Sequence, residues 1–183
     1  MKISKTTIFF FLIIGITFIT SCNRGLRYFN QEMVDEYKWN NAEIKKIQFY
    51  LSEDIVLWRK LKKDDTQIKN GKIRIEDDSK VEEVIIKKNT PGVVLFIPKK
   101  NKYAVSFDSD EDHFLMFGPN PKNKDKYVLL AKDWDRRRGK VTYGKVVYST
   151  NSESAFAGLL VDIKTAKNIK YNSKTASGRR IRK

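Results

Sequence analysis

Short runs of β-branched and aromatic residues, spaced roughly a dozen residues apart, restrict the fold of this chain more than any other feature. They occupy residues 84–86, 93–97, 103–107, 114–117, 127–131, 141–148 and 159–163, and loops rich in Asp, Asn, Lys and Gly separate them. No long helical pattern lies between them, and strands joined without helices form antiparallel sheets. The sequence therefore predicts a mainly β fold, an antiparallel β-sandwich or a barrel-like single domain.

The segment from residue 47 to residue 61 begins this β region. Ile47, Phe49 and Leu51 alternate with polar or amphipathic neighbours, which predicts a half-buried strand. Residues 52–61 fit two structures, a strand or a helix that begins after Ser52. We favour the strand and leave the helix open.

Several turns are expected from Gly, Pro and Asn. Asn70-Gly71 has the composition of a type I′ hairpin turn before a strand that contains Ile73 and Ile75. Residues 90–92, Thr-Pro-Gly, predict a type II turn in a second hairpin. Gly144, inside the run 141–148, predicts a bulge or a sharp bend at a sheet corner.

A short helix is expected before the β region. Asn30 is a good N-cap, acidic residues follow in the first turns, and the helix would extend to Lys38. Met33, Val34 and Tyr37 share one side of it, so we expect this side to pack on the main domain.

The first 21 residues have the organisation of a secretory signal peptide. Lys2 and Lys5 precede an apolar run from Ile8 to Ile19, which is too short to cross a bilayer comfortably. Ile19-Thr20-Ser21-Cys22 then resembles the lipobox of bacterial lipoproteins. The resemblance implies that the mature chain begins at Cys22 and carries two acyl chains on its sulfur, usually with a third on its nitrogen. The alternative is an ordinary signal peptide followed by a chance cysteine.

This resemblance divides the chain into a removed signal (1–21), an acylated anchor, tether and short helix (22–43), a β-domain (44–171) and a tail (172–183). Cys22 is the only cysteine, so the mature domain would have no thiol for disulfides, catalysis or metal binding. The residue directly after Cys22 is Asn23 and not an Asp, and by resemblance to known sorting rules we expect an outer-membrane protein that faces the periplasm.

Positive charge is concentrated at the C-terminus. The formal net charge is +15, or about +13 once the two signal-peptide lysines are removed. No acidic residue follows Asp162, and we expect the tail to be disordered and to use its cations for binding. These are Lys174, Arg179, Arg180, Arg182 and Lys183. Anionic lipids or an acidic protein face are the expected partners, and nucleic acid is not, although a purely solubilising tail is the alternative.

A second candidate binding segment contains Trp134 followed by Arg136, Arg137 and Arg138 in a predicted loop. A flat aromatic ring beside guanidinium groups suits a glycan, a phosphate or an acidic partner. The alternative is a tryptophan that anchors the loop to the core while the arginines are only solvated.

The acidic run Asp108, Asp110 and Asp112 alternates its carboxylates as calcium loops do. An EF-hand starting at Asp108 would need Gly and Glu where the chain has His113 and Pro119, so we expect a solvated hairpin tip without a metal. His113 is the only histidine, which argues against a zinc site or a histidine-based triad.

We therefore expect no cofactor and no enzyme activity. The expected function is that of a membrane-anchored, non-enzymatic accessory or assembly subunit of a cell-envelope complex, of the secretion or transport type. A module that binds glycan, peptidoglycan or lipid is the alternative from another class. A periplasmic hydrolase that uses two carboxylates is the third.

Overall fold

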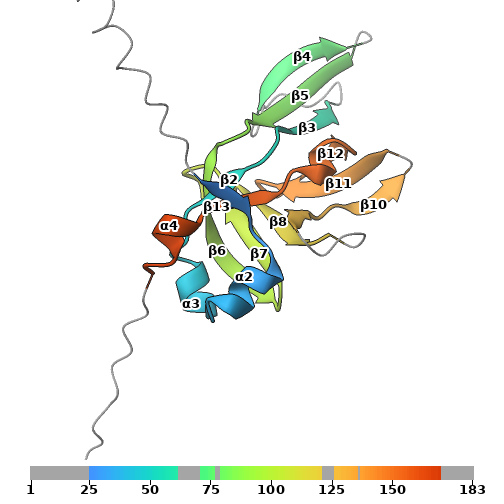
Figure 1. Ribbon diagram of the computed structural model, residues 1–183. Helices are drawn as coiled ribbons and strands as arrows, with labels where there is room; N and C mark the ends of the chain where they lie inside the picture. Colours follow the sequence, from blue (N-terminus) through green and yellow to red (C-terminus); the bar gives the residue numbers. More distant parts are fainter. Residues whose placement is uncertain (1–24, 62–70, 77–78, 121–125, 136, 170–183) are drawn as a thin grey trace, which may run out of the picture.

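The computed structural model describes residues 25–61, 71–76, 79–120, 126–135 and 137–169, and these form two antiparallel sheets (Figure 1). The seven-stranded sheet has the order β1 (Leu26–Tyr28), β13 (Leu159–Asp162), β2 (Phe49–Leu51), β6 (Pro91–Lys99), β7 (Lys102–Ser106), β8 (Phe114–Pro119) and β9 (Tyr127–Leu129). The six-stranded sheet has the order β10 (Lys132–Asp135), β11 (Arg138–Tyr143), β12 (Val146–Asn151), β3 (Ile55–Lys60), β5 (Ser79–Ile86) and β4 (Lys72–Glu76). The predicted mainly β, antiparallel fold is confirmed.

The seven-stranded sheet curls back on itself. Its last strand, β9, donates a backbone hydrogen bond from Tyr127 to the carbonyl of Phe29, which directly follows β1 (3.0 Å). Leu129 donates another to the carbonyl of Ala157, just before β13 (3.1 Å). The rings of Phe29, Phe49 and Tyr127 meet inside the curl, where Phe29 lies 5.0 Å from Phe49 and 5.1 Å from Tyr127 between ring centroids.

The hydrophobic core joins the two sheets. Ile47, Phe49 and Leu51 are all buried, so the alternation predicted for this segment is confirmed, although the strand itself begins only at Phe49. Ser52 is also buried, and its hydroxyl accepts a hydrogen bond from the Gly158 amide (2.8 Å). From the other sheet, Ile55 and Leu57 of β3 belong to the same core, and their segment is the strand that we favoured over the helix.

Four short helical segments complete the described fold: α2 (Gln31–Glu36), α3 (Asn41–Ile44), the 3-10 turn η1 (Ser154–Phe156) and α4 (Ile163–Ala166). The Asn30 side chain caps α2 as predicted, accepting a hydrogen bond from the Met33 amide (2.9 Å), but α2 ends at Glu36 rather than at Lys38. Asn40 and Glu43 form a capping box that starts α3, a helix that we did not predict. Figure 1 shows α2, α3 and α4 beside the seven-stranded sheet, away from β4 and β5.

Two predicted hairpin turns are wrong. β4 pairs with β5, which follows it, and not with β3, which precedes it, so no hairpin joins β3 to β4 across Gly71; Asn70 lies outside the described residues. Gly71 is needed instead because a Cβ there would lie 2.2 Å from the carbonyl oxygen of Glu83. The segment 90–92 joins strands of different sheets, and β6 already begins at Pro91.

The run 141–148 is not one strand with a bulge or a corner bend. It is the end of β11 and the start of β12, joined by a two-residue turn with Tyr143 opposite Val146. Gly144 and Lys145 both have positive φ, at 55° and 63°, which is the backbone of a type I′ turn. The glycine therefore reverses the chain direction within one sheet.

Candidate functional site

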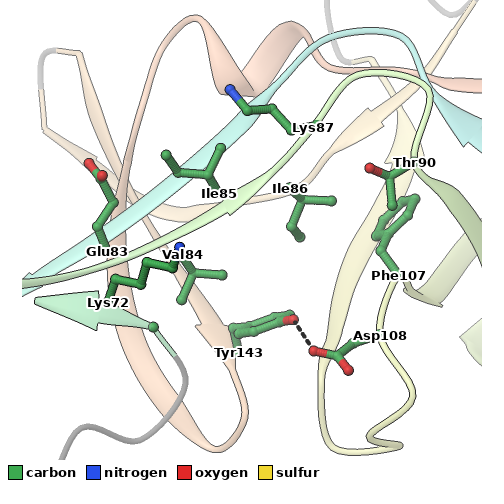
Figure 2. Close-up of a pocket in the computed structure, with 11 residues that line it drawn as sticks. Lys72, Glu83, Val84, Ile85, Ile86, Lys87, Thr90, Phe107, Asp108 and Tyr143 are labelled. Carbon is green, nitrogen blue, oxygen red and sulfur yellow. Dashed lines mark hydrogen bonds between the residues drawn. The ribbon is translucent and has the colours of Figure 1, made fainter.

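A cleft of about 670 Å³ lies where the six-stranded sheet meets the end of β7 (Figure 2). Its apolar wall consists of Val84 and Ile86 from β5, Phe107 after β7 and Tyr143 from the end of β11. Its charged rim includes Lys72 and Asp108, and the other lining residues are Gly71, Glu83, Ile85, Lys87 and Thr90. Both sheets therefore contribute to one concave surface.

The strand register explains why β5 supplies the apolar wall. Val84 lies opposite Leu57 and Ile86 lies opposite Ile55, and both partners are buried core residues of β3. Side chains at these alternate positions of β5 therefore face the interior side of the sheet. Val84 is only half-buried, so the cleft opens where β5 extends beyond the covered part of the core.

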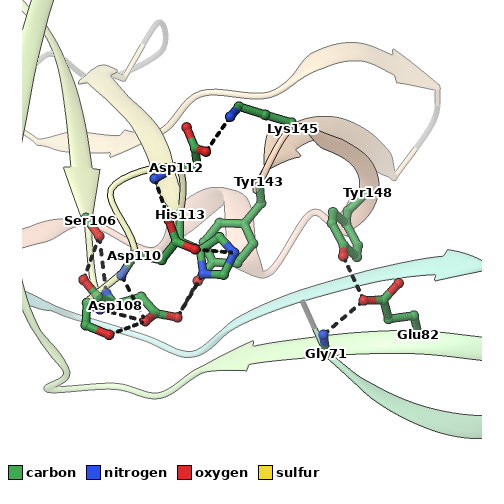
Figure 3. Close-up of polar contacts among 11 residues, drawn as sticks. Gly71, Glu82, Ser106, Asp108, Asp110, Asp112, His113, Tyr143, Lys145 and Tyr148 are labelled. Atoms are coloured by element: carbon green, nitrogen blue, oxygen red, sulfur yellow. Dashed lines mark hydrogen bonds and ion pairs between the residues drawn. The ribbon is translucent and has the colours of Figure 1, made fainter. Parts of the chain in front are cut away.

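Asp108, His113 and Tyr143 form a polar cluster at one end of the cleft (Figure 3). The Oδ2 atom of Asp108 lies 3.0 Å from Nδ1 of His113 and accepts a longer hydrogen bond from the Tyr143 hydroxyl (3.4 Å). The His113 ring stacks on the Tyr143 ring, with 4.7 Å between centroids and 22° between planes. The hydrogen bond with His113 lowers the pKa of the Asp108 carboxyl, whereas burial raises the pKa of Tyr143.

The loop between β7 and β8 uses its carboxylates to hold its own backbone. Oδ1 of Asp108 accepts a hydrogen bond from the Ser109 amide (2.6 Å), and Oδ1 of Asp110 accepts one from the Asp112 amide (2.9 Å). Asp112 forms an ion pair with Lys145 of the neighbouring hairpin turn. The prediction of a hairpin tip is confirmed, and within the described ranges no group of three or more His, Cys, Asp and Glu side chains is arranged to hold a metal ion.

A buried ion pair lies behind the cleft. The Glu82 side chain is 0% exposed, and its Oε2 atom accepts a hydrogen bond from Nε of Arg59 (2.7 Å) and forms an ion pair with Nη2 of the same residue (2.6 Å). Its Oε1 atom accepts hydrogen bonds from the Gly71 amide (2.9 Å) and the Tyr148 hydroxyl (3.1 Å). One carboxylate therefore connects β3, β5, β12 and the residue before β4. Figure 3 shows its contacts with Gly71 and Tyr148.

Sequence reasoning missed both the cleft and this ion pair. Arg59 and Glu82 are 23 residues apart in the chain, and only the register between β3 and β5 places them opposite each other. The sequence pattern places Tyr143 inside one continuous strand, 141–148, and so does not predict its position at a hairpin end beside Asp108. A local signal existed only for the loop 108–113, whose charged residues lie between two phenylalanines.

The tryptophan predicted for a binding loop lies in the edge strand β10 instead. Trp134 is 44% exposed, and a Cβ on Gly139 of the adjacent strand β11 would lie 3.0 Å from its ring, so the ring lies against the sheet. Arg138 is opposite Asp135 in the β10–β11 hairpin, and Arg137 belongs to the turn. None of these residues lines the cleft.

The other predicted binding residues lie outside the described residues. They are Cys22, Arg136 and the tail cations Lys174, Arg179, Arg180, Arg182 and Lys183. Lipidation and tail binding therefore stay predictions. In the part of the chain that the structure describes, no helix is long and apolar enough to span a membrane.

Comparison with known proteins gave no match: no family model, no curated protein and no solved structure is similar to this chain at a significant level. The functional argument therefore depends on the geometry of the chain itself.

Proposed function

We propose that the chain is a bacterial envelope lipoprotein, anchored through acyl chains on Cys22, whose β-domain is a non-enzymatic accessory subunit that binds a partner protein in the cleft. The partner belongs to an envelope complex of the secretion or transport type. The observation that carries this proposal is the cleft itself, a concave surface with an apolar strand wall and a rim of both charges.

The chemistry of the cleft favours a polypeptide segment as its occupant. Val84, Ile86 and Phe107 offer an apolar wall for one or two hydrophobic side chains. Lys72 and Asp108 carry opposite charges at the rim, so flanking acidic and basic residues of a partner find complementary groups there. Apolar anchors surrounded by a polar rim are the usual arrangement of protein interfaces.

Only a few residues separate the proposed anchor from the first strand, which would keep the β-domain close to the membrane. β1 begins at Leu26, only four residues after Cys22, and fully extended chain covers at most about 3.6 Å per residue. The acylated cysteine would therefore hold the domain within roughly 14 Å of the lipid headgroups. A partner that is itself embedded in the membrane or attached to it would therefore be present near the domain at a high effective concentration.

A ligand-binding module for glycan, peptidoglycan or lipid is the second candidate. The cleft volume of about 670 Å³ favours it, because small-molecule sites generally occupy roughly 300 to 1,000 Å³. In this case an isolated ligand would fill the cleft without a protein partner.

The two candidates differ in what is purified with the protein. The tagged full chain is extracted gently from its native envelope, and associated proteins are compared between wild type and Lys72→Glu, which reverses a charge at the cleft rim. Lys80→Glu, an exposed position on β5 outside the cleft lining, is the matched control. Deletion of residues 170–183 tests the tail without removing Ala166 and Ile169, which pack on the core.

The accessory proposal predicts a stoichiometric envelope partner that Lys72→Glu weakens and Lys80→Glu retains. If the wild-type protein is recovered alone and instead binds a glycan or lipid that Lys72→Glu weakens, the second candidate is correct. A partner retained equally by both variants would contradict binding through the cleft.

A further inference from the structure

A second cavity lies between β8 and the strands β10, β11 and β12. It has a volume of about 360 Å³ and is formed by residues of β8, β10, β11 and β12 together with Leu130. Its lining includes four apolar side chains and two lysines: Phe114, Met116, Leu130, Val147, Lys132 and Lys140. We refer to these six residues as the lysine groove.

The apolar floor of the lysine groove faces away from the core. On β8, Leu115 and Phe117 are buried, so the alternation of the strand turns Phe114 and Met116 outward. On β12, Tyr148 is buried, whereas Val147 is 57% exposed. The floor is therefore apolar surface that the core does not use.

Another aromatic residue extends the apolar floor beyond the cavity. Phe96 of β6 packs edge-on against Phe114, with 4.9 Å between ring centroids, and is 39% exposed. Large apolar side chains gathered on one exposed face of a soluble domain usually mark a contact with another apolar molecule.

The two lysines of the groove lie directly opposite each other, since Lys132 pairs with Lys140 in the β10–β11 register. Like charges at such positions repel each other and destabilise the strand pair. Among the described residues, neither ammonium group forms an ion pair with a carboxylate. The carboxylate of Asp133 also lines the cavity, which leaves the groove with a net positive charge.

We propose that the lysine groove binds an anionic amphiphile with a single acyl chain, its chain on the apolar floor and its carboxylate or phosphate head between Lys132 and Lys140. An anion between the two ammonium groups would convert their repulsion into two attractions. The volume is near the lower end of the range for small-molecule sites, about 300 to 1,000 Å³, which suits one chain rather than two. This inference is independent of the cleft and of the partner proposed for it.

The test uses photo-crosslinking in membranes isolated from cells that express the tagged full chain. The probes are a palmitic acid that carries a diazirine in its chain, its methyl ester, and a lysophosphatidic acid with the same chain. After irradiation, the protein is purified under denaturing conditions and the labelled peptides are mapped. The two anionic probes distinguish a fatty acid from a lysophospholipid as the source of the head group.

The groove predicts labelling by at least one anionic probe at the peptides containing Met116, Leu130 or Val147. Lys132→Gln/Lys140→Gln should reduce it about tenfold, because two exposed charge contacts together contribute on the order of 1 to 2 kcal/mol. Lys80→Gln/Lys102→Gln, which removes two exposed lysines elsewhere, should leave it unchanged. The methyl ester should label as weakly as the acid labels the double groove variant.

Val147→Glu provides a second variant that does not depend on the lysines. Because Val147 is exposed, the substitution should preserve the fold, yet it places a negative charge on the apolar floor and should abolish labelling at the groove. Val93→Glu, at another exposed β-branched position, is its control. Labelling by neither anionic probe, equal labelling by acid and ester, or labelling that survives both groove variants would overturn the proposal.

Discussion

Replacing Arg59 by methionine tests whether the ion pair behind the cleft holds the six-stranded sheet together. Methionine retains most of the length of the side chain but removes the guanidinium group from beside the fully buried Glu82 carboxylate. Breaking a buried pair in this way generally costs about 3 to 5 kcal/mol. Because the Gly71 amide and the Tyr148 hydroxyl still donate to Glu82, we expect a loss of about 3 kcal/mol.

The measurement is urea unfolding of the purified protein, followed by tryptophan fluorescence, with the free energy of unfolding compared at constant m-value. Lys60→Met is the matched control, because Lys60 is the exposed neighbour of Arg59 in β3, and it should change stability by less than about 0.5 kcal/mol. Adding Glu82→Gln to Arg59→Met removes the buried negative charge and should recover about 2 kcal/mol.

Two outcomes would refute this reasoning. If Arg59→Met unfolds at the same urea concentration as Lys60→Met, the pair contributes no net stability. If the double variant is no more stable than Arg59→Met, the loss comes from packing of the arginine stem rather than from the lost charge interaction with Glu82.

Two further predictions concern a glycine and a carboxylate. Gly71→Ala should destabilise the protein by about 1 to 3 kcal/mol in the same urea assay, because its Cβ would collide with the Glu83 carbonyl. Gly25→Ala is the control and should have no effect, because a Cβ there would have nothing within 4 Å. Equal stability of the two variants would contradict the close approach at Gly71. Hydrogen bonds from the Lys87 side chain and the Lys88 amide lower the pKa of Asp54. The ionised Asp54 carboxylate therefore stabilises the folded state above the unfolded-state pKa of about 3.9, and this stabilisation is lost as the pH falls through the lower pKa of the folded state. The stability difference between wild type and Asp54→Asn should therefore shrink below roughly pH 4, and a difference constant from pH 3 to pH 7 would contradict the assignment.

The elements that depend on local sequence were predictable. The alternation of Ile47, Phe49 and Leu51 identified a buried face because strand periodicity is visible within five residues. The cap at Asn30 was predicted for the same reason, since it depends on one side chain and the next helical turn. The positions of β6, β7, β8, β9 and β13 followed from β-branched and aromatic runs, whereas the run 141–148 contains two strands and β10 was predicted as a loop.

Features that depend on strand order were not predictable. The sequence around Gly71 and around Gly144 has turn composition, yet of these two glycines only Gly144 lies in a hairpin turn between paired strands, because turn composition does not specify which strands pair. The Arg59–Glu82 pair needs the β3–β5 register. The cleft needs the same register together with the position of the other sheet, so the candidate site emerges only when the whole fold is known.

The proposed anchor at Cys22 is the basis for placing the domain at an envelope membrane, and the chemical state of this cysteine tests it most directly. The measurement is mass spectrometry of the N-terminal peptide from the native envelope, combined with palmitate labelling of wild type and Cys22→Ser. We predict a wild-type chain that begins at acylated Cys22, and an unlabelled Cys22→Ser chain that keeps residues 1–21. A mature wild-type chain without acyl groups, or a Cys22→Ser chain that still takes up palmitate, would contradict the proposal.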